Sequence, residues 1–269
     1  MHVAVLQFAS SRDRAENRSV ISDGLSQLSP DAWDLIVLPE AAMRDFGPPD
    51  DDLRPDAEHV YADPATDAGP GDDRFAAMLG SEAVRLQSTI VAGMFERTDN
   101  LPYNTLVLAA PDGTVTPAYR KIHLYDSFGY RESDRMAAGP IEPSVVSIAD
   151  TRVGLMTCYD LRFPELARTL VDAGAEILIV PTAWVAGDGK LDHWRTLIKA
   201  RAIENTVDVV GAAQCGDRYT GHSTVISAAG TVLTEADNEP GIVTATLSAE
   251  DRQAARRRNP SLANRRMGR

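Results

Sequence analysis

Residues 153–165 read Val-Gly-Leu-Met-Thr-Cys-Tyr-Asp-Leu-Arg-Phe-Pro-Glu and place a cysteine between two kinds of structure. The apolar run before Cys158 is typical of a buried strand, and Pro164 suits the first turn of a helix. A tight turn from strand to helix holds a nucleophile exposed beside backbone N–H groups. We therefore expect Cys158 to be a nucleophile and the N–H of Tyr159 to face an oxyanion.

Short runs rich in Val, Ile and Leu recur on both sides of this segment, and several alternate with helical patterns. The predicted strands are 3–8, 35–38, 89–95, 105–109, 145–148, 153–157, 177–180 and 207–212. The predicted helices are 14–28, 73–87, 164–173 and 192–205. Tight turns at 112–113, 150–151 and 229–230 indicate hairpins, so we predict an α/β fold with helices layered on mixed sheets.

The length of 269 residues is close to the upper limit for one hydrophobic core. No repeat or convincing linker divides the chain, so we expect a single domain over 1–269. The one long irregular stretch runs from Pro48 to Gly71, and such loops often border the entrance of a site.

Charge and cysteine content exclude several classes of function. A net charge of −12 argues against general binding to nucleic acid or to an anionic membrane. Two cysteines are too few for a disulfide scaffold, and the chain shows neither an export signal nor a membrane-spanning run, so we expect a cytoplasmic protein. The five histidines are dispersed without a recognised ligand spacing, and we predict no metal site.

Charge is nevertheless distributed unevenly. Every charged residue in 252–269 is an arginine, whereas 45–73 is crowded with acids. The arginine-rich tail is either a frayed, solvated end or a segment that packs against an acidic surface of its own or a neighbouring subunit.

Three reactive side chains follow the ends of three predicted strands: Glu40, Lys121 and Cys158. In layered α/β proteins such ends converge on one crevice. A free thiol is only a few per cent thiolate at neutral pH, so its site must supply a base or a positive charge. We expect Glu40 to accept the thiol proton and Lys121 to stabilise the thiolate and the oxyanion, a role worth roughly 3 to 4 kcal/mol.

These residues lie in motifs that resemble the three signature segments of the nitrilase superfamily of carbon-nitrogen hydrolases. The segments are Leu-Pro-Glu40, Tyr119-Arg-Lys121-Ile-His-Leu-Tyr-Asp126 and Thr157-Cys158-Tyr-Asp-Leu-Arg-Phe-Pro-Glu165, in the family's order. The similarity continues through 181–184, 193–194, 199–205 and 221–224, and so covers nearly the whole chain. Together with Ala212-Ala-Gln-Cys-Gly216, the third segment most resembles the Nit-type branch of omega-amidases and deaminated glutathione amidases.

The resemblance implies a four-layer αββα sandwich of two mixed sheets flanked by helices. It also implies no metal, no organic cofactor and a homodimer or larger assembly. The segment Tyr130-Arg-Glu132-Ser matches the family's Glu-containing loop, so Glu132 is expected to orient Lys121 or to hold the attacking water. The implied reaction is hydrolysis of a small amide through a thioester on Cys158, with release of ammonia.

Other functions stay open at this point. His123 stands two residues beyond Lys121 and could serve as the base of a papain-like Cys-His pair. Cys158 could be a redox sensor with Cys215 as its partner, although Cys215 fits better as a packing residue. The thioester could also be passed to an amine, the substrate could be a nitrile or a carbamoyl compound, or the fold could serve binding alone.

The substrate is predicted less sharply. Tyr125, Phe128 and Trp184 are expected near the mouth of the site, where aromatic faces flank a small acyl chain. Arg162 could receive a substrate carboxylate in a bidentate pair, as a dicarboxylate monoamide would require. Arg131 and Lys190 are the other candidates for this positive charge.

Overall fold

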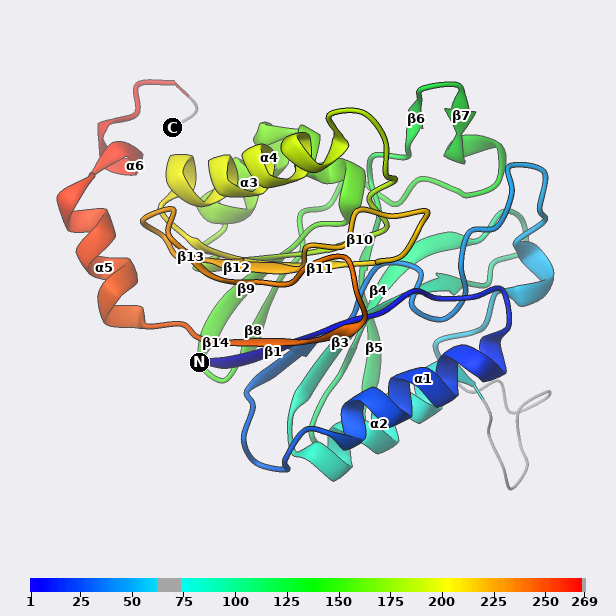
Figure 1. Cartoon of the computed structure of the whole chain (residues 1–269). Coiled ribbons are helices and arrows are strands. Elements are labelled where there is room, and N and C mark those ends of the chain that lie inside the picture. Colours follow the sequence, from blue (N-terminus) through cyan, green and yellow to red (C-terminus); the bar gives the residue numbers. More distant parts are fainter. Residues whose placement is uncertain (62–73, 268–269) are drawn as a thin grey trace.

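The computed structural model describes residues 1–61 and 74–267. In Figure 1, two sheets lie face to face in the middle of the molecule, with a pair of helices outside each sheet. This is the four-layer αββα arrangement that the family resemblance implies.

The first sheet has six strands in the order β14-β1-β2-β3-β4-β5. The strands β1, β2 and β3 are parallel, and the other neighbours in the sheet are antiparallel. The bounds are β1 His2–Gln7, β2 Leu35–Val37, β3 Thr89–Glu96, β4 Tyr103–Ala109, β5 Val115–Arg120 and β14 Gly241–Thr246.

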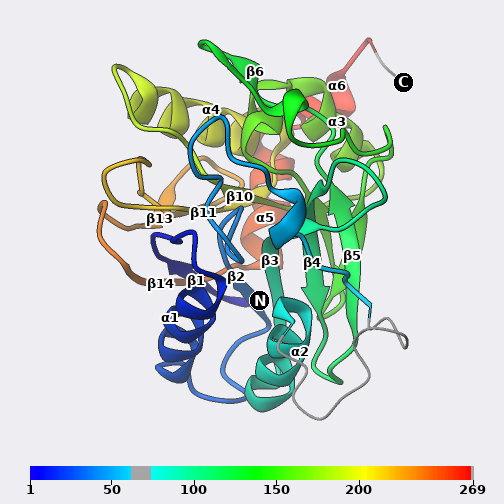
Figure 2. The same ribbon diagram turned by 90° about the vertical axis from the view of Figure 1, so that its right-hand side faces the viewer.

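The second sheet repeats this design in the order β13-β12-β11-β10-β9-β8, with β9, β10 and β11 parallel. Its bounds are β8 Val145–Ile148, β9 Thr151–Leu155, β10 Ile177–Thr182, β11 Asp208–Ala213, β12 Thr224–Ile226 and β13 Val232–Glu235. A separate hairpin of β6 Asp126–Ser127 and β7 Tyr130–Arg131 projects from the body of the molecule (Figures 1 and 2).

The helices cover the outer faces of the sheets. Helices α1 (Arg14–Ser26) and α2 (Phe75–Leu86) lie against the first sheet, and α3 (Pro164–Asp172) and α4 (Lys190–Asn205) lie against the second (Figures 1 and 2). Two further helices, α5 (Ala249–Arg258) and α6 (Ser261–Asn264), follow β14. Within 1–61 and 74–267, no helix combines the length and the apolar character needed to cross a membrane.

The alternation of side chains along β1 shows why the layers form. Val3 and Val5 belong to the apolar cluster between the two sheets, whereas Ala4 and Leu6 belong to the cluster under α1 and α2. Successive side chains of a strand point to opposite faces, so a strand that is apolar at every position is buried on both faces. Such a sheet needs a sheet on one side and helices on the other.

The predicted elements all occur, with ends that differ by a few residues. The turn predicted at 150–151 is centred one residue earlier, on Ala149 and Asp150, which both have positive φ. The strand β14 was missed, because it is only partly buried at the edge of the first sheet and lacks the longer runs of Val, Ile and Leu that mark the buried strands.

The irregular stretch from Pro48 to Gly71 is described only as far as residue 61. The guanidinium of Arg135 donates to the carbonyl of Asp51 in this stretch at 2.8 Å, and to the carbonyl of Phe46 just before it at 2.5 Å. The rest of the predicted entrance loop lies outside the described residues.

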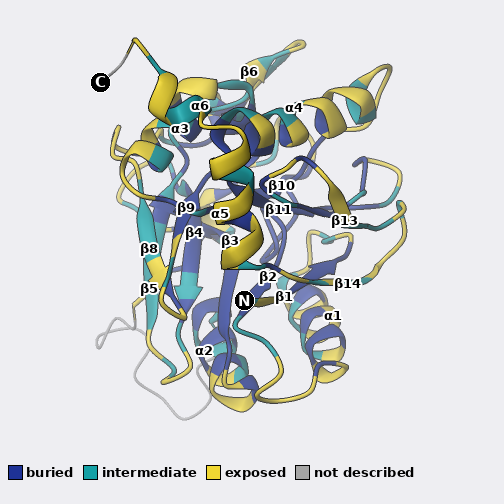
Figure 3. Cartoon of the chain, turned by 90° about the vertical axis from the view of Figure 1, so that its left-hand side faces the viewer, coloured by how far each residue is buried: buried dark blue, intermediate teal, exposed yellow. Residues whose placement is uncertain are grey.

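The arginine-rich tail is not frayed along its first half, which corrects that alternative. Helix α5 is mostly exposed (Figure 3), but Arg252 is buried. Its guanidinium pairs with Asp208 at 2.6 Å and with Glu176 at 3.2 Å, and Arg265 pairs with Asp172. The tail therefore packs against acidic groups of its own chain, which is the other alternative that the charge pattern offered.

We expect Arg252→Ala to lower the free energy of unfolding by about 3 kcal/mol, because it leaves the buried carboxylate of Asp208 without its ion-pair partner. Urea unfolding of wild type and variant measures this difference. The matched control is Arg257→Ala, which removes an exposed arginine from the same helix and should change stability by less than about 0.5 kcal/mol. Equal losses in both variants would contradict a specific role for the buried pair.

Candidate active site

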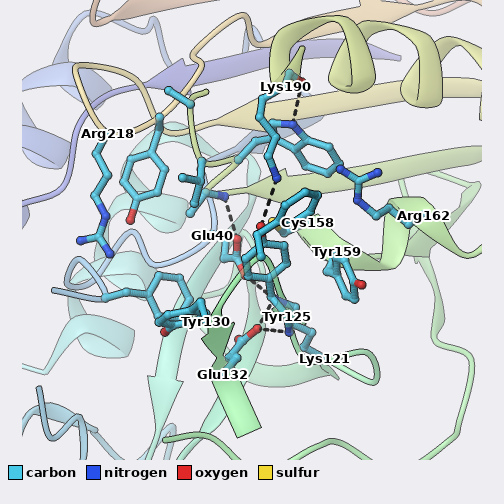
Figure 4. Close-up of a pocket in the computed structure, with 17 residues that line it drawn as sticks. Glu40, Lys121, Tyr125, Tyr130, Glu132, Cys158, Tyr159, Arg162, Lys190 and Arg218 are labelled. Atoms are coloured by element: carbon cyan, nitrogen blue, oxygen red, sulfur yellow. Dashed lines mark hydrogen bonds and ion pairs between the residues drawn. The ribbon is translucent and has the colours of Figure 1, made fainter. Parts of the chain in front are cut away.

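A cavity of about 300 Å³ lies beyond the carboxyl ends of several strands of both sheets. Figure 4 shows the side chains around it, with Glu40, Lys121 and Glu132 close together and Cys158 beside them. The three strand-end residues predicted to converge therefore do so. The lining residues are Glu40, Phe46, Lys121, Tyr125, Phe128, Tyr130, Glu132, Cys158, Tyr159, Arg162, Ala183, Trp184, Val185, Ala186, Lys190, Arg218 and Tyr219.

Cys158 begins a 3-10 turn, Cys158–Arg162, that connects β9 to α3. Its φ is 46°, a left-handed conformation that is uncommon for a residue other than glycine. Strained backbone of this kind persists where the surroundings hold it. Tyr159 follows Cys158 in the turn and lines the cavity. The expected hydrogen bond from its backbone N–H to an oxyanion stays a prediction.

Asp160 is fully buried and holds this turn in place. One carboxylate oxygen accepts hydrogen bonds from the backbone N–H of Thr157 and the hydroxyl of Tyr119, at 2.8 and 2.7 Å. The other oxygen lies 3.2 Å from the backbone nitrogen and 2.7 Å from Nδ1 of His123. Asp160 thus ties the turn that carries Cys158 to the segment that carries Lys121.

The same contacts decide where His123 lies. Its ring stacks on Phe163 with 3.8 Å between the ring centroids, and its Nδ1 faces Asp160. His123 does not line the cavity, whereas Glu40 does. The geometry therefore favours Glu40 over His123 as the base for Cys158.

Glu40 is 1% exposed, and both of its carboxylate oxygens accept hydrogen bonds. Oε1 accepts from Lys121 Nζ at 3.0 Å and from Asn104 Nδ2 at 2.7 Å, and Oε2 accepts from the backbone N–H of Ala183 at 2.7 Å. Ala183 follows β10 of the second sheet, so Glu40 connects the two sheets at their carboxyl ends.

The backbone at Glu40 is held closely as well. A Cβ on Gly93 of β3 would come within 2.7 Å of the Glu40 Cα, so only glycine permits this approach. Gln214, which follows β11, donates from Nε2 to the Glu40 carbonyl at 2.9 Å. The position of Glu40 therefore depends on strands from both sheets.

Lys121 follows β5 and is 2% exposed. Its Nζ donates to Glu132 Oε2 at 2.8 Å as well as to Glu40. Burial alone would lower the pKa of Lys121, but the charges of Glu132 and Glu40 oppose this effect and keep the pKa well above its usual value. Lys121 is consequently an ammonium ion across the physiological range.

Glu132, the position carried over from the family resemblance, is buried on the other side of Lys121. Its Oε2 also accepts the backbone N–H of Tyr125 at 2.7 Å, and its Oε1 accepts Asn104 Nδ2 at 3.2 Å. Sequence reasoning missed Asn104, which contacts both carboxylates, because a single polar residue in a strand carries no signal of its own.

The surroundings of the Cys158 thiol favour its protonated form. Burial raises its pKa, the charge of Glu40 raises it further, and Lys121 only partly offsets the two effects, so the pKa is well above the usual value for cysteine. A base must remove the proton when the thiol reacts, and Glu40 is the carboxylate whose charge acts most strongly on it.

The mouth of the cavity contains most of the residues predicted to contact substrate. Arg162 lies over the ring of Trp184, with 4.9 Å between its Cζ and the ring centroid. Lys190 Nζ is 3.1 Å from the hydroxyl of Tyr125 and 3.6 Å from the ring centroid of Phe128.

Two predicted residues lie elsewhere. Arg131 is exposed near Asp134, 3.4 Å away, and does not line the cavity, which corrects its selection as a substrate contact. Cys215 is buried after β11 and is also absent from the lining, and burial, with Glu239, raises its pKa to about 11. Arg218 and Tyr219 also line the cavity, and sequence reasoning missed both because neither lies in a recognised motif.

The arrangement can perform acyl transfer chemistry. A thiol lies beside a carboxylate that can take its proton, and an ammonium group lies where an oxyanion would form. Among residues 1–61 and 74–267, no group of three or more His, Cys, Asp or Glu side chains is arranged to hold a metal ion.

Comparison with known proteins gives a consistent result. The sequence model of the carbon-nitrogen hydrolase family matches residues 2–257. A deaminated glutathione amidase from Escherichia coli O157:H7 is 35% identical over 268 residues, which cover 99% of this chain and 97% of that protein.

Two solved structures extend the comparison. A CN-hydrolase superfamily protein from Xanthomonas campestris, with an arsenic adduct in its active site, is 28% identical with a TM-score of 0.86 and covers 100% of this chain and 98% of its own. A mutant of an amidase from Nesterenkonia sp. AN1, in which one glutamate is replaced by glutamine, shows covalent addition of the acetamide moiety of fluoroacetamide at the active site cysteine. It is 26% identical with a TM-score of 0.79, and the match covers 99% of this chain and 94% of that chain.

We expect Asp160→Asn to lower the free energy of unfolding by about 3 kcal/mol, because an amide NH₂ would replace an oxygen that now accepts two hydrogen bonds. Chemical unfolding measures the loss. Asp134→Asn, which changes an exposed aspartate, serves as the control and should leave stability unchanged. If both variants unfolded at the same midpoint denaturant concentration as wild type, Asp160 would not hold the turn.

Proposed function

This chain belongs to the carbon-nitrogen hydrolase family and is an amide-hydrolysing enzyme, and from this premise we propose that it acts through a thioester on Cys158 and releases ammonia from a small omega-amide. The observation that carries the proposal is the placement of Lys121 between Glu40 and Glu132 beside the thiol. Nucleophile, base and oxyanion partner are then together in one buried cavity.

The first half of the reaction forms the thioester. Glu40 takes the proton of the Cys158 thiol while the sulfur attacks the amide carbon. The carbonyl oxygen becomes an oxyanion, which the Lys121 ammonium and the N–H of Tyr159 stabilise. Glu40 then gives its proton to the amide nitrogen, the carbon-nitrogen bond breaks, and ammonia leaves.

The second half hydrolyses the thioester. Glu40, now a carboxylate again, takes a proton from water as the water oxygen attacks the thioester carbon. The carbon-sulfur bond breaks, the acid product leaves, and the proton returns to Cys158. Glu132 holds Lys121 in place throughout. The covalent adduct on the active site cysteine of the Nesterenkonia amidase supports this use of the cysteine.

The charges at the cavity mouth support a substrate that carries a carboxylate. Among the described residues, neither Arg162 nor Lys190 has an acidic side chain within ion-pair distance, although the chain as a whole is strongly acidic. Burial lowers the pKa of Lys190, and the charge of Arg162 lowers it further. Two close cations without counter-ions are stabilised when an anion binds between them.

We therefore assign the substrate to omega-amides of small carboxylic acids. The cavity volume of about 300 Å³ suits such a ligand. Tyr125, Phe128 and Trp184 would flank its acyl chain, with the carboxylate at Arg162 and Lys190 and the amide at Cys158. The similarity to a deaminated glutathione amidase supports an amide of this class.

Cys158→Ala and Glu40→Gln should each reduce ammonia release to background, because the first removes the nucleophile and the second removes the base. The assay measures ammonia from succinamate, alpha-ketoglutaramate and deaminated glutathione. His123→Asn is the matched control, since His123 faces Asp160 and not the cavity, and it should retain much of the wild-type kcat. Loss of activity in His123→Asn with activity retained in Glu40→Gln would assign the base to His123.

Product analysis separates this reaction from its alternatives. Ammonia and the free acid should form in equal amounts. Transfer of the acyl group to an added amine, or activity on a nitrile or carbamoyl compound but on no amide, would overturn the proposed reaction.

Arg162→Met and Lys190→Met should each raise KM for carboxylate-bearing amides by about 10- to 100-fold, which is the effect of losing one charged hydrogen bond. KM for an uncharged amide such as butyramide should stay within about threefold. Arg131→Met is the control, because Arg131 is exposed away from the cavity. Equal changes for charged and uncharged amides would contradict carboxylate recognition by these residues.

A further inference from the structure

Asn104 contacts both carboxylates of the site. It lies on β4 and is 1% exposed. Its Nδ2 is 2.7 Å from Glu40 Oε1 and 3.2 Å from Glu132 Oε1, so the two amide hydrogens can serve one carboxylate each. Lys121 makes a similar pair of contacts, to Glu40 Oε1 and Glu132 Oε2.

The charge balance shows why a second donor is needed. Glu40 and Glu132 carry two negative charges, and Lys121 carries the positive charge between them. Like charges held close together in a buried site tend to make one of the groups take up a proton. A neutral group that donates to both carboxylates stabilises the doubly ionised pair without adding charge.

The orientation of the amide indicates that this is what Asn104 does. Its Nδ2 donates to Glu40 and Glu132, and its Oδ1 is buried without a hydrogen-bond partner among the described residues. The reversed amide would point that oxygen at two carboxylates. The carboxylates therefore set the orientation, at the expense of an unpaired oxygen.

The backbone of Asn104 takes part as well. Its carbonyl accepts the backbone N–H of Lys121 at 2.8 Å. Asn104 is thus bonded to Glu40, Glu132 and Lys121, three residues that come from three separate parts of the chain.

We propose that Asn104 is a positioning residue that keeps Glu40 and Glu132 as two ionised carboxylates around Lys121, so that Glu40 is ready to take the thiol proton. This assignment rests on the proposed function for the role of Glu40. Asn104 reaches the substrate only through Glu40 and Lys121, since it does not line the cavity.

Other titratable groups face this cluster and are left in place by the test. Cys158 contacts it from the 3-10 turn after β9, and Lys121 from the end of β5. The tyrosines that face the two carboxylates or line the same cavity are Tyr125, Tyr130 on β7, Tyr159 in the 3-10 turn and Tyr219 after β11.

The test replaces the amide by an apolar group of similar size. In Asn104→Leu, the two carboxylates lose the neutral donor that they share. The acid limb of the pH profile of kcat/KM should move upward by about one pH unit, and kcat should fall about 10- to 100-fold with KM little changed.

The matched control is Asn17→Leu. Asn17 is also 1% exposed, and its Nδ2 donates to the carbonyls of Ser11 and Met43, none of which lines the cavity. This variant should lose stability but keep the wild-type pH profile. A wild-type acid limb in Asn104→Leu, or the same shift in Asn17→Leu, would overturn the proposal.

A second measurement does not need an amide substrate. The pH dependence of alkylation of Cys158 by iodoacetamide, followed in Cys215→Ser protein, reports proton loss from the Glu40 and Cys158 pair. Its acid limb should move upward in Asn104→Leu as well. A shift in alkylation with no ammonia release from any amide would retain the role of Asn104 and reject the proposed substrate, whereas an unshifted profile would reject the role itself.

Asn104→Ser covers the case in which Asn104→Leu fails to fold. Serine has one O–H donor where asparagine has two N–H donors, so it can serve only one carboxylate at a time. Its acid limb should lie between those of wild type and Asn104→Leu, and above wild type by a measurable shift. A Ser variant with the wild-type profile in both assays would overturn the proposal.

Discussion

A lysine ammonium that is almost completely buried between two carboxylates is the constraint on which the site depends. Removing such a charge from water is unfavourable unless close opposite charges and hydrogen bonds replace the solvent. Glu40 and Glu132 supply the charges for Lys121, and Asn104 supplies the extra donor for the two carboxylates. Each group is acceptable in the interior only because the others are there, so the arrangement forms as a unit.

The αββα fold makes this arrangement possible because it brings the carboxyl ends of two sheets together. Glu40 follows a strand of the first sheet and accepts a hydrogen bond from Ala183, which follows a strand of the second. Asp160 joins the turn of Cys158 to the segment that precedes and follows Lys121. The nucleophile, the base and the ammonium group are therefore positioned by packing between sheets, which a single sheet could not provide.

The charged groups at the mouth of the cavity are paired differently from those deeper in the site. In the cluster of Glu40, Lys121 and Glu132, every charge has a partner of opposite sign. At the mouth, Arg162 and Lys190 rest against aromatic rings and have no acidic partner among the described residues, in a chain that is acidic overall. The paired charges hold the reacting groups in place, whereas the unpaired cations are available to bind a ligand. This difference in pairing supports a substrate that reacts at the paired groups and carries a negative charge toward the mouth.

The sequence by itself determined the layers and the reactive residues. Apolar strands buried on both faces require sheets with helices outside, and strand ends with Glu40, Lys121 and Cys158 predicted one crevice, while Glu132 came from the family resemblance. Only the tertiary structure decided which groups hold them. Asn104 and Ala183 contact Glu40 from 64 and 143 residues away, and Arg252 is buried although its neighbours are solvated. No local pattern carries such contacts, because they depend on which strand ends meet in space.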